Sequence, residues 1–193
     1  MYNEEIELSI NTQLELIGTA RDMHEAIGEH SMRVSNLAVK LGHELDLNNE
    51  EMTTLRIGSY FHDVGKMYVS KDILNSTNKL TKIERKKIQN HPLVGARCFS
   101  KNDDFLKISE IISLHHERID GEGYPYGLHG SLIPKLVKIV SICDSYDAMI
   151  DKRSYRQQPL SEEEALCELI RHSGTQFDAV LVEIFVEMIR NKN

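Results

Sequence analysis

The chain has 193 residues, of which 40% are hydrophobic and 27% are charged. This balance is typical of a soluble globular protein, and the length predicts one domain with a sizeable core. A formal net charge of −7 argues against electrostatic binding to long nucleic acid or to anionic membranes.

The sequence carries no sign of export or of membrane insertion. No apolar run approaches the roughly 18 residues of a membrane span, and the N-terminus lacks a signal-peptide pattern. The three cysteines form no CxxC pair, so they indicate neither a disulfide framework nor a thiolate zinc site. We expect a cytoplasmic protein in which Cys98, Cys143 and Cys167 are small core residues.

Two amphipathic helices are predicted at the start of the chain. Ile6, Ile10 and Leu14 follow an i, i+4, i+8 stripe, which predicts a leading helix within residues 1–20 or a homodimer contact. The main domain is then expected over residues 21–193. Its first helix runs from about residue 23 to residue 45 and carries His30 on its apolar face. By itself, His30 is as consistent with a buried structural histidine as with a ligand.

Capping signals place the next two helices. A helix begins at Asn48 or Asn49 and reaches the His62-Asp63 pair, where Val64-Gly65-Lys66 breaks it. The sequence from Thr81 to Glu84 has capping-box spacing and opens another helix. That helix must end or restart at His91, because a proline follows it.

A further helix, capped by Asp103 or Asp104, is expected to end at the His115-His116 pair. Residues 117–134 then hold four of the eleven glycines and two of the four prolines, which predicts one long loop. Long ordered loops in compact domains are often functional.

Three helical segments complete the chain. One follows Pro134 and reaches Asp144 and Asp147, a second begins with a capping box at Ser161, and the last begins at Asp178. No alternating strand pattern of useful length occurs. The predicted fold is therefore all-α, a single-domain helical bundle.

Histidines and aspartates recur at or near the ends of these predicted helices, and helix ends can converge on one pocket in a bundle. A set of nitrogen and oxygen donors without cysteine favours iron, manganese or zinc at a catalytic site. There are more donors than one ion needs. Two ions about 3.5–4 Å apart, bridged by a carboxylate and a hydroxide, would hydrolyse a phosphoester. The donors are His30, His62, Asp63, His91, His115, His116 and Asp144.

Two motifs resemble those of a known family. The run from His62 to Lys66 and the run from His115 to Pro125 are similar to the two signatures of the HD-GYP phosphodiesterases. The second signature is long and very specific. Residues 144–148 and 174–178 also fall in family order, so the resemblance extends from about His30 to Phe185.

The resemblance implies an HD-type fold and hydrolysis of a cyclic dinucleotide, usually cyclic di-GMP, to linear pGpG or GMP. The seven donors would be the metal ligands, with Asp63 bridging two ions and Lys66 stabilising a phosphate or the attacking hydroxide. Iron or manganese is expected, with zinc, nickel or magnesium as alternatives. Asp147 would orient a ligand. The residues that match substrate-contacting positions are Gly121, Gly123, Tyr124, Arg153 and Arg156.

Three departures from the family pattern concern the metal count and two loops. Ala26 stands where three-metal members have a glutamate, which favours a two-metal centre and puts a third ion in doubt. Ser76-Thr77-Asn78 replaces the usual Lys-Pro-Gly, and Ser154 replaces a proline. Both of these loop changes leave the donor set intact.

Two other functions remain open. One is an HD-type phosphohydrolase that acts on another nucleotide or on a hybrid cyclic dinucleotide. The other is a catalytically silent module that senses cyclic dinucleotides or docks onto a signalling partner such as a diguanylate cyclase. Silent relatives would be expected to lose ligands, whereas every two-metal donor is present here.

Overall fold

The computed structural model describes residues 25–100, 102–151 and 158–191, with side chains described from Gly28 onward. The predicted leading helix at residues 1–20, together with Arg153, Ser154 and Arg156, lies outside the described residues. The predicted helical fold is confirmed: the described residues contain isolated β-bridges but no strand.

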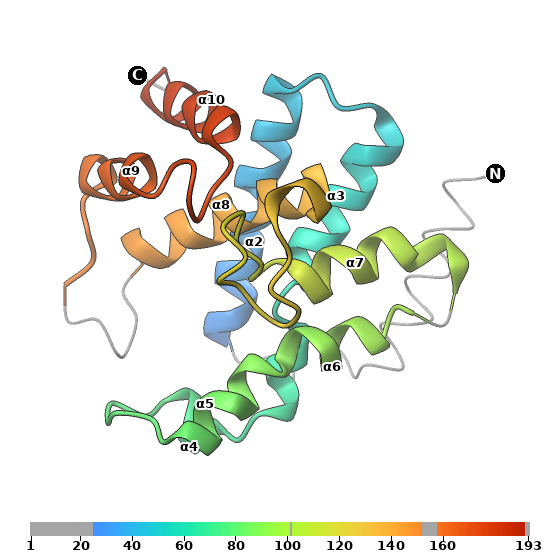
Figure 1. The fold of residues 1–193 in the computed structure, drawn as a ribbon, viewed down its shortest axis with the longest axis vertical. Helices are drawn as coiled ribbons and strands as arrows, with labels where there is room; N and C mark the ends of the chain where they lie inside the picture. Colours follow the sequence, from blue (N-terminus) through green and yellow to red (C-terminus); the bar gives the residue numbers. More distant parts are fainter. Residues whose placement is uncertain (1–24, 101, 152–157, 192–193) are drawn as a thin grey trace.

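Four helices surround the centre of the molecule (Figure 1). Helix α2 (Glu25–Glu44) packs against α3 (Asn49–Phe61) and against α8 (Lys135–Ile150), and α3 also packs against α7 (Leu106–Leu114). Val34, Leu55, Ile111 and Ile139 are fully or almost fully buried where these helices meet. The centre of the fold is therefore a bundle whose helix ends can face one another.

Shorter elements extend this bundle in two directions. A 3₁₀ turn η1 (Val64–Tyr68) and helices α4 (Lys71–Leu74), α5 (Lys82–Gln89) and α6 (His91–Arg97) follow α3, and α6 packs on η1 and α7. Helices α9 (Glu162–Arg171) and α10 (Ala179–Arg190) pack on α8, and α10 lies at the opposite end of the molecule from α4 and α5 in Figure 1.

Side-chain caps explain four of the eight helix starts from α3 to α10. Asn48, Thr81 and Ser161 each form a capping box with the glutamate three residues later, and the Asp178 side chain accepts a hydrogen bond from the Leu181 amide. These predictions are confirmed. They succeeded because a capping box needs only residues within one turn.

The cap predicted at Asp103 or Asp104 was wrong. The Asn102 side chain accepts from the Asp104 amide, and a 3₁₀ turn η2 (Asp103–Phe105) precedes α7. The short side chain one residue earlier already reaches the exposed amide, so the two aspartates lie inside the first turn.

The loop predicted between α7 and α8 is present and contains one further 3₁₀ turn, η3 (Gly130–Leu132). It lies in front of α8 in Figure 1. Among the described residues, no helix is both long and apolar enough to cross a membrane.

Candidate metal centre

Seven buried or half-buried side chains from five helices converge in the middle of the bundle. His30 comes from α2, the His62-Asp63 pair follows α3, His91 begins α6, the His115-His116 pair follows α7, and Asp144 lies on α8. These are the seven predicted donors, and the structure brings all of them together.

The donors form two groups that could each hold a metal ion. One group consists of Asp63, His91, His115 and His116, and the other of His30, His62 and Asp144; within each group, one ligand atom per residue lies within 4.8 Å of the others. Such nitrogen and oxygen sets suit divalent transition metals.

Asp63 connects the two groups. Its Oδ1 atom lies 3.0 Å from His91 Nε2 and 3.8 Å from His115 Nε2. Its Oδ2 atom lies 3.5 Å from His62 Nε2 and 4.0 Å from His30 Nε2. A carboxylate whose two oxygens face different donor sets has the geometry of a bridging ligand.

Backbone carbonyls define which nitrogen of three histidines carries the proton. The Nδ1 atoms of His62, His91 and His115 lie 2.6, 2.7 and 2.8 Å from the carbonyl oxygen three residues earlier in each case. A carbonyl only accepts, so Nδ1 must donate. Each Nε2 atom then presents a lone pair to the centre.

The fourth ring, His30, is held by a carboxylate instead. Its Nδ1 atom lies 2.7 Å from Asp147 Oδ2, and its Nε2 atom lies 3.0 Å from Asp144 Oδ1. Asp147 therefore occupies the orienting position expected of it. Arg33 in turn donates to both Asp147 oxygens, at 2.7 and 3.0 Å, a contact that the sequence did not predict.

The unmatched atoms at the centre fit a bound cation. Among the described residues, the buried atoms His62 Nε2 and Asp63 Oδ1 have no hydrogen-bond partner, and the Nε2 atoms of His91 and His115 are only 3.4 Å apart. Lone pairs facing one another in a buried site repel, and buried polar atoms are normally satisfied. Cations between these atoms would satisfy them, so the residues present fit divalent metal ions.

Two groups at the centre are held in the charge state that metal binding needs. Burial alone would raise the pKa of Asp63, but Lys66 and His62 outweigh it and hold that pKa well below its usual range. Burial lowers the pKa of His116 to about 3. The carboxylate is therefore ionised and this imidazole is neutral.

His62 shows the strength of the negative field. Burial alone would lower its pKa, but Asp63 and Asp144 raise it to about 10. At such a pKa the His62 ring would carry a proton on Nε2 and would have no lone pair there, unless a metal ion replaced that proton. We favour the neutral ring in the loaded centre, because a divalent ion and a proton compete for the same atom.

The glycine-rich loop is built around a buried acid that sequence reasoning missed. Glu117 accepts hydrogen bonds from the Tyr126 and Leu128 amides at 2.7 and 2.8 Å. A Cβ at Gly123 would lie 2.4 Å from the Arg118 nitrogen and 2.6 Å from the Glu117 Cα, so the loop requires glycine there. The available signal was an acid at the first position of the glycine-rich segment 117–134.

This loop places Tyr124 over the metal centre. The Tyr124 ring lies 4.7 Å from that of His116, tilted by 30°. Burial raises the pKa of Tyr124, and the negative charges of Asp63 and Asp144 raise it further. Its hydroxyl therefore stays protonated. Gly121, with a φ of 81°, adopts the left-handed conformation that favours glycine.

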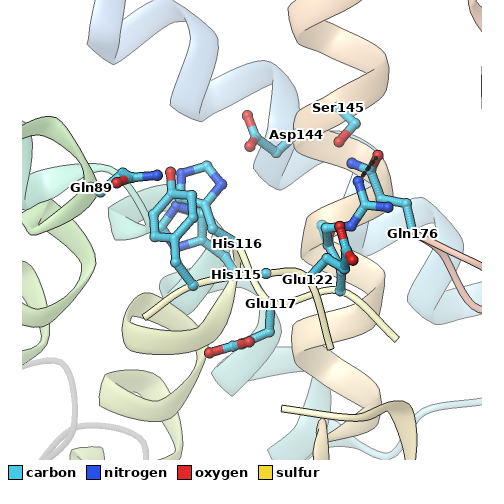
Figure 2. A pocket seen from close by; sticks show the side chains of 12 residues that line it. Gln89, His115, His116, Glu117, Glu122, Asp144, Ser145 and Gln176 are labelled. Atoms are coloured by element: carbon cyan, nitrogen blue, oxygen red, sulfur yellow. Dashed lines mark hydrogen bonds between the residues drawn. The ribbon is translucent and has the colours of Figure 1, made fainter. Parts of the chain in front are cut away.

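A cavity of about 290 Å³ opens over the donors. In Figure 2 Gln89 lies on one side, Ser145 and Gln176 lie on the other, and Glu117 points away from Asp144. Lys66 borders the same centre, with Nζ 2.5 Å from Asp63 Oδ2. Of the three loop residues predicted to contact substrate, Gly123 and Tyr124 line the cavity, whereas Gly121 is not among its lining residues.

Replacing Glu117 with glutamine is expected to lower stability by about 1–3 kcal/mol, because the buried Glu117 carboxylate accepts from two loop amides and one of them loses its acceptor. Thermal unfolding and hydrogen exchange at Tyr126 and Leu128 would measure this. The exposed neighbour Glu122→Gln is the matched control and should stay within about 0.5 kcal/mol of the wild type. Equal stability of both variants would contradict the anchoring role.

Comparison with known proteins identifies the family. The HD domain family matches residues 16–181. The chain is 33% identical over 153 residues to the cyclic di-GMP phosphodiesterase response regulator RpfG of Xanthomonas campestris pv. campestris, covering 78% of this chain and 40% of that protein. The chain belongs to the HD domain family, and its HD-GYP resemblance is confirmed.

Two further likenesses define the range of relatives. The 3'3'-cGAMP-specific phosphodiesterase 2 of Vibrio cholerae is 33% identical over 201 residues, covering 97% of this chain and 38% of that protein. Bd1817, a HDG"Y"P protein from Bdellovibrio bacteriovorus, has a similar structure, with a TM-score of 0.69 and 22% identity over 85% of this chain and 52% of that one. The chain spans less than half the length of these curated relatives.

Proposed function

We propose that this chain is a metal-dependent phosphodiesterase that hydrolyses a cyclic dinucleotide. The observation that carries the proposal is Asp63, whose two oxygens face two separate donor groups in a buried site. A pair of divalent ions there would supply Lewis acidity and lower the pKa of a coordinated water. This chemistry suits attack on a phosphodiester.

The protein's own residues would hold the substrate and the charge. The Lys66 ammonium, beside Asp63, lies where it can stabilise a phosphate oxygen or the attacking oxygen. Tyr124, protonated and stacked on His116, can donate to the substrate from the loop side. The roles of Arg153 and Arg156 in substrate contact rest on the family resemblance alone.

We assign the ligands as His30, His62, Asp63, His91, His115, His116 and Asp144. Two ions are proposed, because imidazoles and carboxylates form two groups that suit divalent metals. The preference for iron or manganese over zinc, nickel or magnesium rests on the family resemblance. Ala26, within α2, supplies no donor for a third ion.

Cyclic di-GMP is the first candidate substrate, since relatives such as RpfG are named for it, and linear pGpG or GMP would be the product. A hybrid cyclic dinucleotide is the second candidate, because a relative of equal identity is named for 3'3'-cGAMP. The same proposal includes a cytoplasmic location.

The test is to purify the protein without oxygen, load it separately with Fe(II), Mn(II) and Zn(II), and follow both cyclic dinucleotides by chromatography. We expect turnover with at least one metal and its loss on chelation. Binding without turnover under every metal condition would instead indicate a silent sensor. The absence of both binding and turnover under every metal condition would refute the proposal.

A further inference from the structure

A second cavity adjoins the metal centre. It has a volume of about 520 Å³, and its wall includes Ala148 and Met149 of α8 and the buried ring of Phe177. Glu168 and His172 give it a polar edge, with 3.7 Å between Oε2 and Nε2. An apolar wall with a few polar groups suits a flat heteroaromatic ring.

The two cavities share two lining residues, Ser145 and Gln176, so they lie next to each other. Figure 2 shows these two side chains close together at the rim, on the same side of the cavity as Asp144. The first cavity, at about 290 Å³, lies at the lower limit of the volumes of pockets that bind drug-sized ligands. A cyclic dinucleotide is larger than the ligand that such a pocket would enclose. A substrate with its scissile phosphate over the metal centre must therefore extend beyond this cavity.

The Gln176 amide is held in one orientation. Asp120 accepts two hydrogen bonds from Arg118, at 3.0 and 2.5 Å, and Arg118 Nη1 donates to Gln176 Oε1 at 3.0 Å. The amides of Ile119 and Asp120 also donate to the Gln176 and Thr175 carbonyls. Because the side-chain oxygen is engaged, the NH₂ group is the part left to meet a ligand.

Within the described part of the chain, the Gln176 amide nitrogen donates no hydrogen bond to the protein. An amide that offers only donors matches guanine, whose N7 and O6 atoms both accept. It matches adenine less well, because adenine pairs an N7 acceptor with an N6 donor. The arrangement thus discriminates between the two purines.

We infer that the second cavity is a subsite for a guanine base of the cyclic dinucleotide, and that Gln176 selects guanine there. The base would stack on the apolar wall of Met149 and Phe177 and present N7 and O6 to Gln176. The inference rests on the proposed function, since it concerns the same substrate. It deepens that function by naming the base and the residue that recognises it.

The test compares the wild type with Gln176→Met, a substitution that keeps the side-chain length and removes the donors. With metal-loaded protein, hydrolysis of bis(p-nitrophenyl) phosphate reports on the metal centre, since this small diester does not need a guanine subsite. Cyclic di-GMP and cyclic di-AMP are then added as competitors, and their inhibition constants are measured.

We expect the wild type to bind cyclic di-GMP more tightly than cyclic di-AMP. Gln176→Met should weaken cyclic di-GMP by about 10- to 100-fold, the usual effect of losing a two-hydrogen-bond contact to a base. Cyclic di-AMP should be affected much less, so the ratio of the two inhibition constants, and not the absolute rate with the small diester, measures the loss of guanine selection. Met149→Ala should weaken both cyclic dinucleotides alike, because it removes wall area and no donor.

The outcomes separate the inference from the proposed function. If Gln176→Met weakens both cyclic dinucleotides equally, or neither, the guanine subsite is wrong while the phosphodiesterase proposal stands. If the wild type hydrolyses the small diester but binds no cyclic dinucleotide, the proposed substrate class fails and the subsite with it. If the wild type hydrolyses no diester at all, the enzymatic proposal itself fails.

Discussion

Asp63→Asn is expected to weaken metal binding by at least about 100-fold, because loss of an outer partner of a metal ligand alone costs about 10- to 100-fold. The reason is its position: both carboxylate oxygens face nitrogen donors, at 3.0 Å from His91 and 3.5 Å from His62. The amide of asparagine would direct its NH₂ group, which does not bind a metal ion, at one of the two groups of metal ligands. Metal content by mass spectrometry and phosphodiester turnover should fall together.

The matched control is Asp104→Asn, the same chemical change at an exposed position in η2. It should keep the metal content and turnover of the wild type. Thermal unfolding of both variants in a chelator separates loss of metal from loss of fold. Full metal content in Asp63→Asn would contradict the bridging assignment.

Gly65→Ala is expected to destabilise the protein by about 3 kcal/mol or more, at or above the upper range for overpacked sites. A Cβ at Gly65 would lie 2.0 Å from the His91 carbonyl oxygen and 2.7 Å from the Gly95 nitrogen. Both are backbone atoms of α6, so the whole helix must move away from η1. His91 begins that helix and would move with it.

Thermal unfolding measures this effect, and at about 2–4 °C per kcal/mol the melting temperature should fall by roughly 6–12 °C. Gly28→Ala is the control, because among the described residues no atom outside the adjoining backbone of its own helix lies within 4 Å of the Cβ it would add. Within helix α2 it should leave stability unchanged or raise it by up to about 1 kcal/mol. A Gly65→Ala variant as stable as Gly28→Ala would refute the close packing of η1 on α6.

Features that depend on neighbours within one turn could be predicted. The capping boxes at Asn48, Thr81 and Ser161 are of this kind, and so are the helix ends that carry His62 and His115. The cap at Asn102 was missed because several polar residues compete for one amide there, and the sequence does not rank them.

Contacts between distant segments could not be predicted in this way. Arg33 reaches Asp147 across 114 positions, and Arg118 reaches Gln176 across 58. Spacing along the chain carries no information on such pairs, because they form only where two packed helices or a loop and a turn meet. The buried role of Glu117 was missed for a different reason: its partners lie only 9 and 11 positions away, but a loop has no periodicity that would indicate such a contact.

The sequence by itself therefore determined the helical class and the family and indicated seven candidate donors, since these follow from periodicity, local capping and the family motifs. Only the tertiary structure decided how the donors divide into two groups, that Asp63 faces both, and that Gln176 presents a donor at the junction of two cavities. The physical reason is that ligand geometry depends on lone-pair directions. Those are defined by carbonyl and carboxylate partners that only packing brings into place.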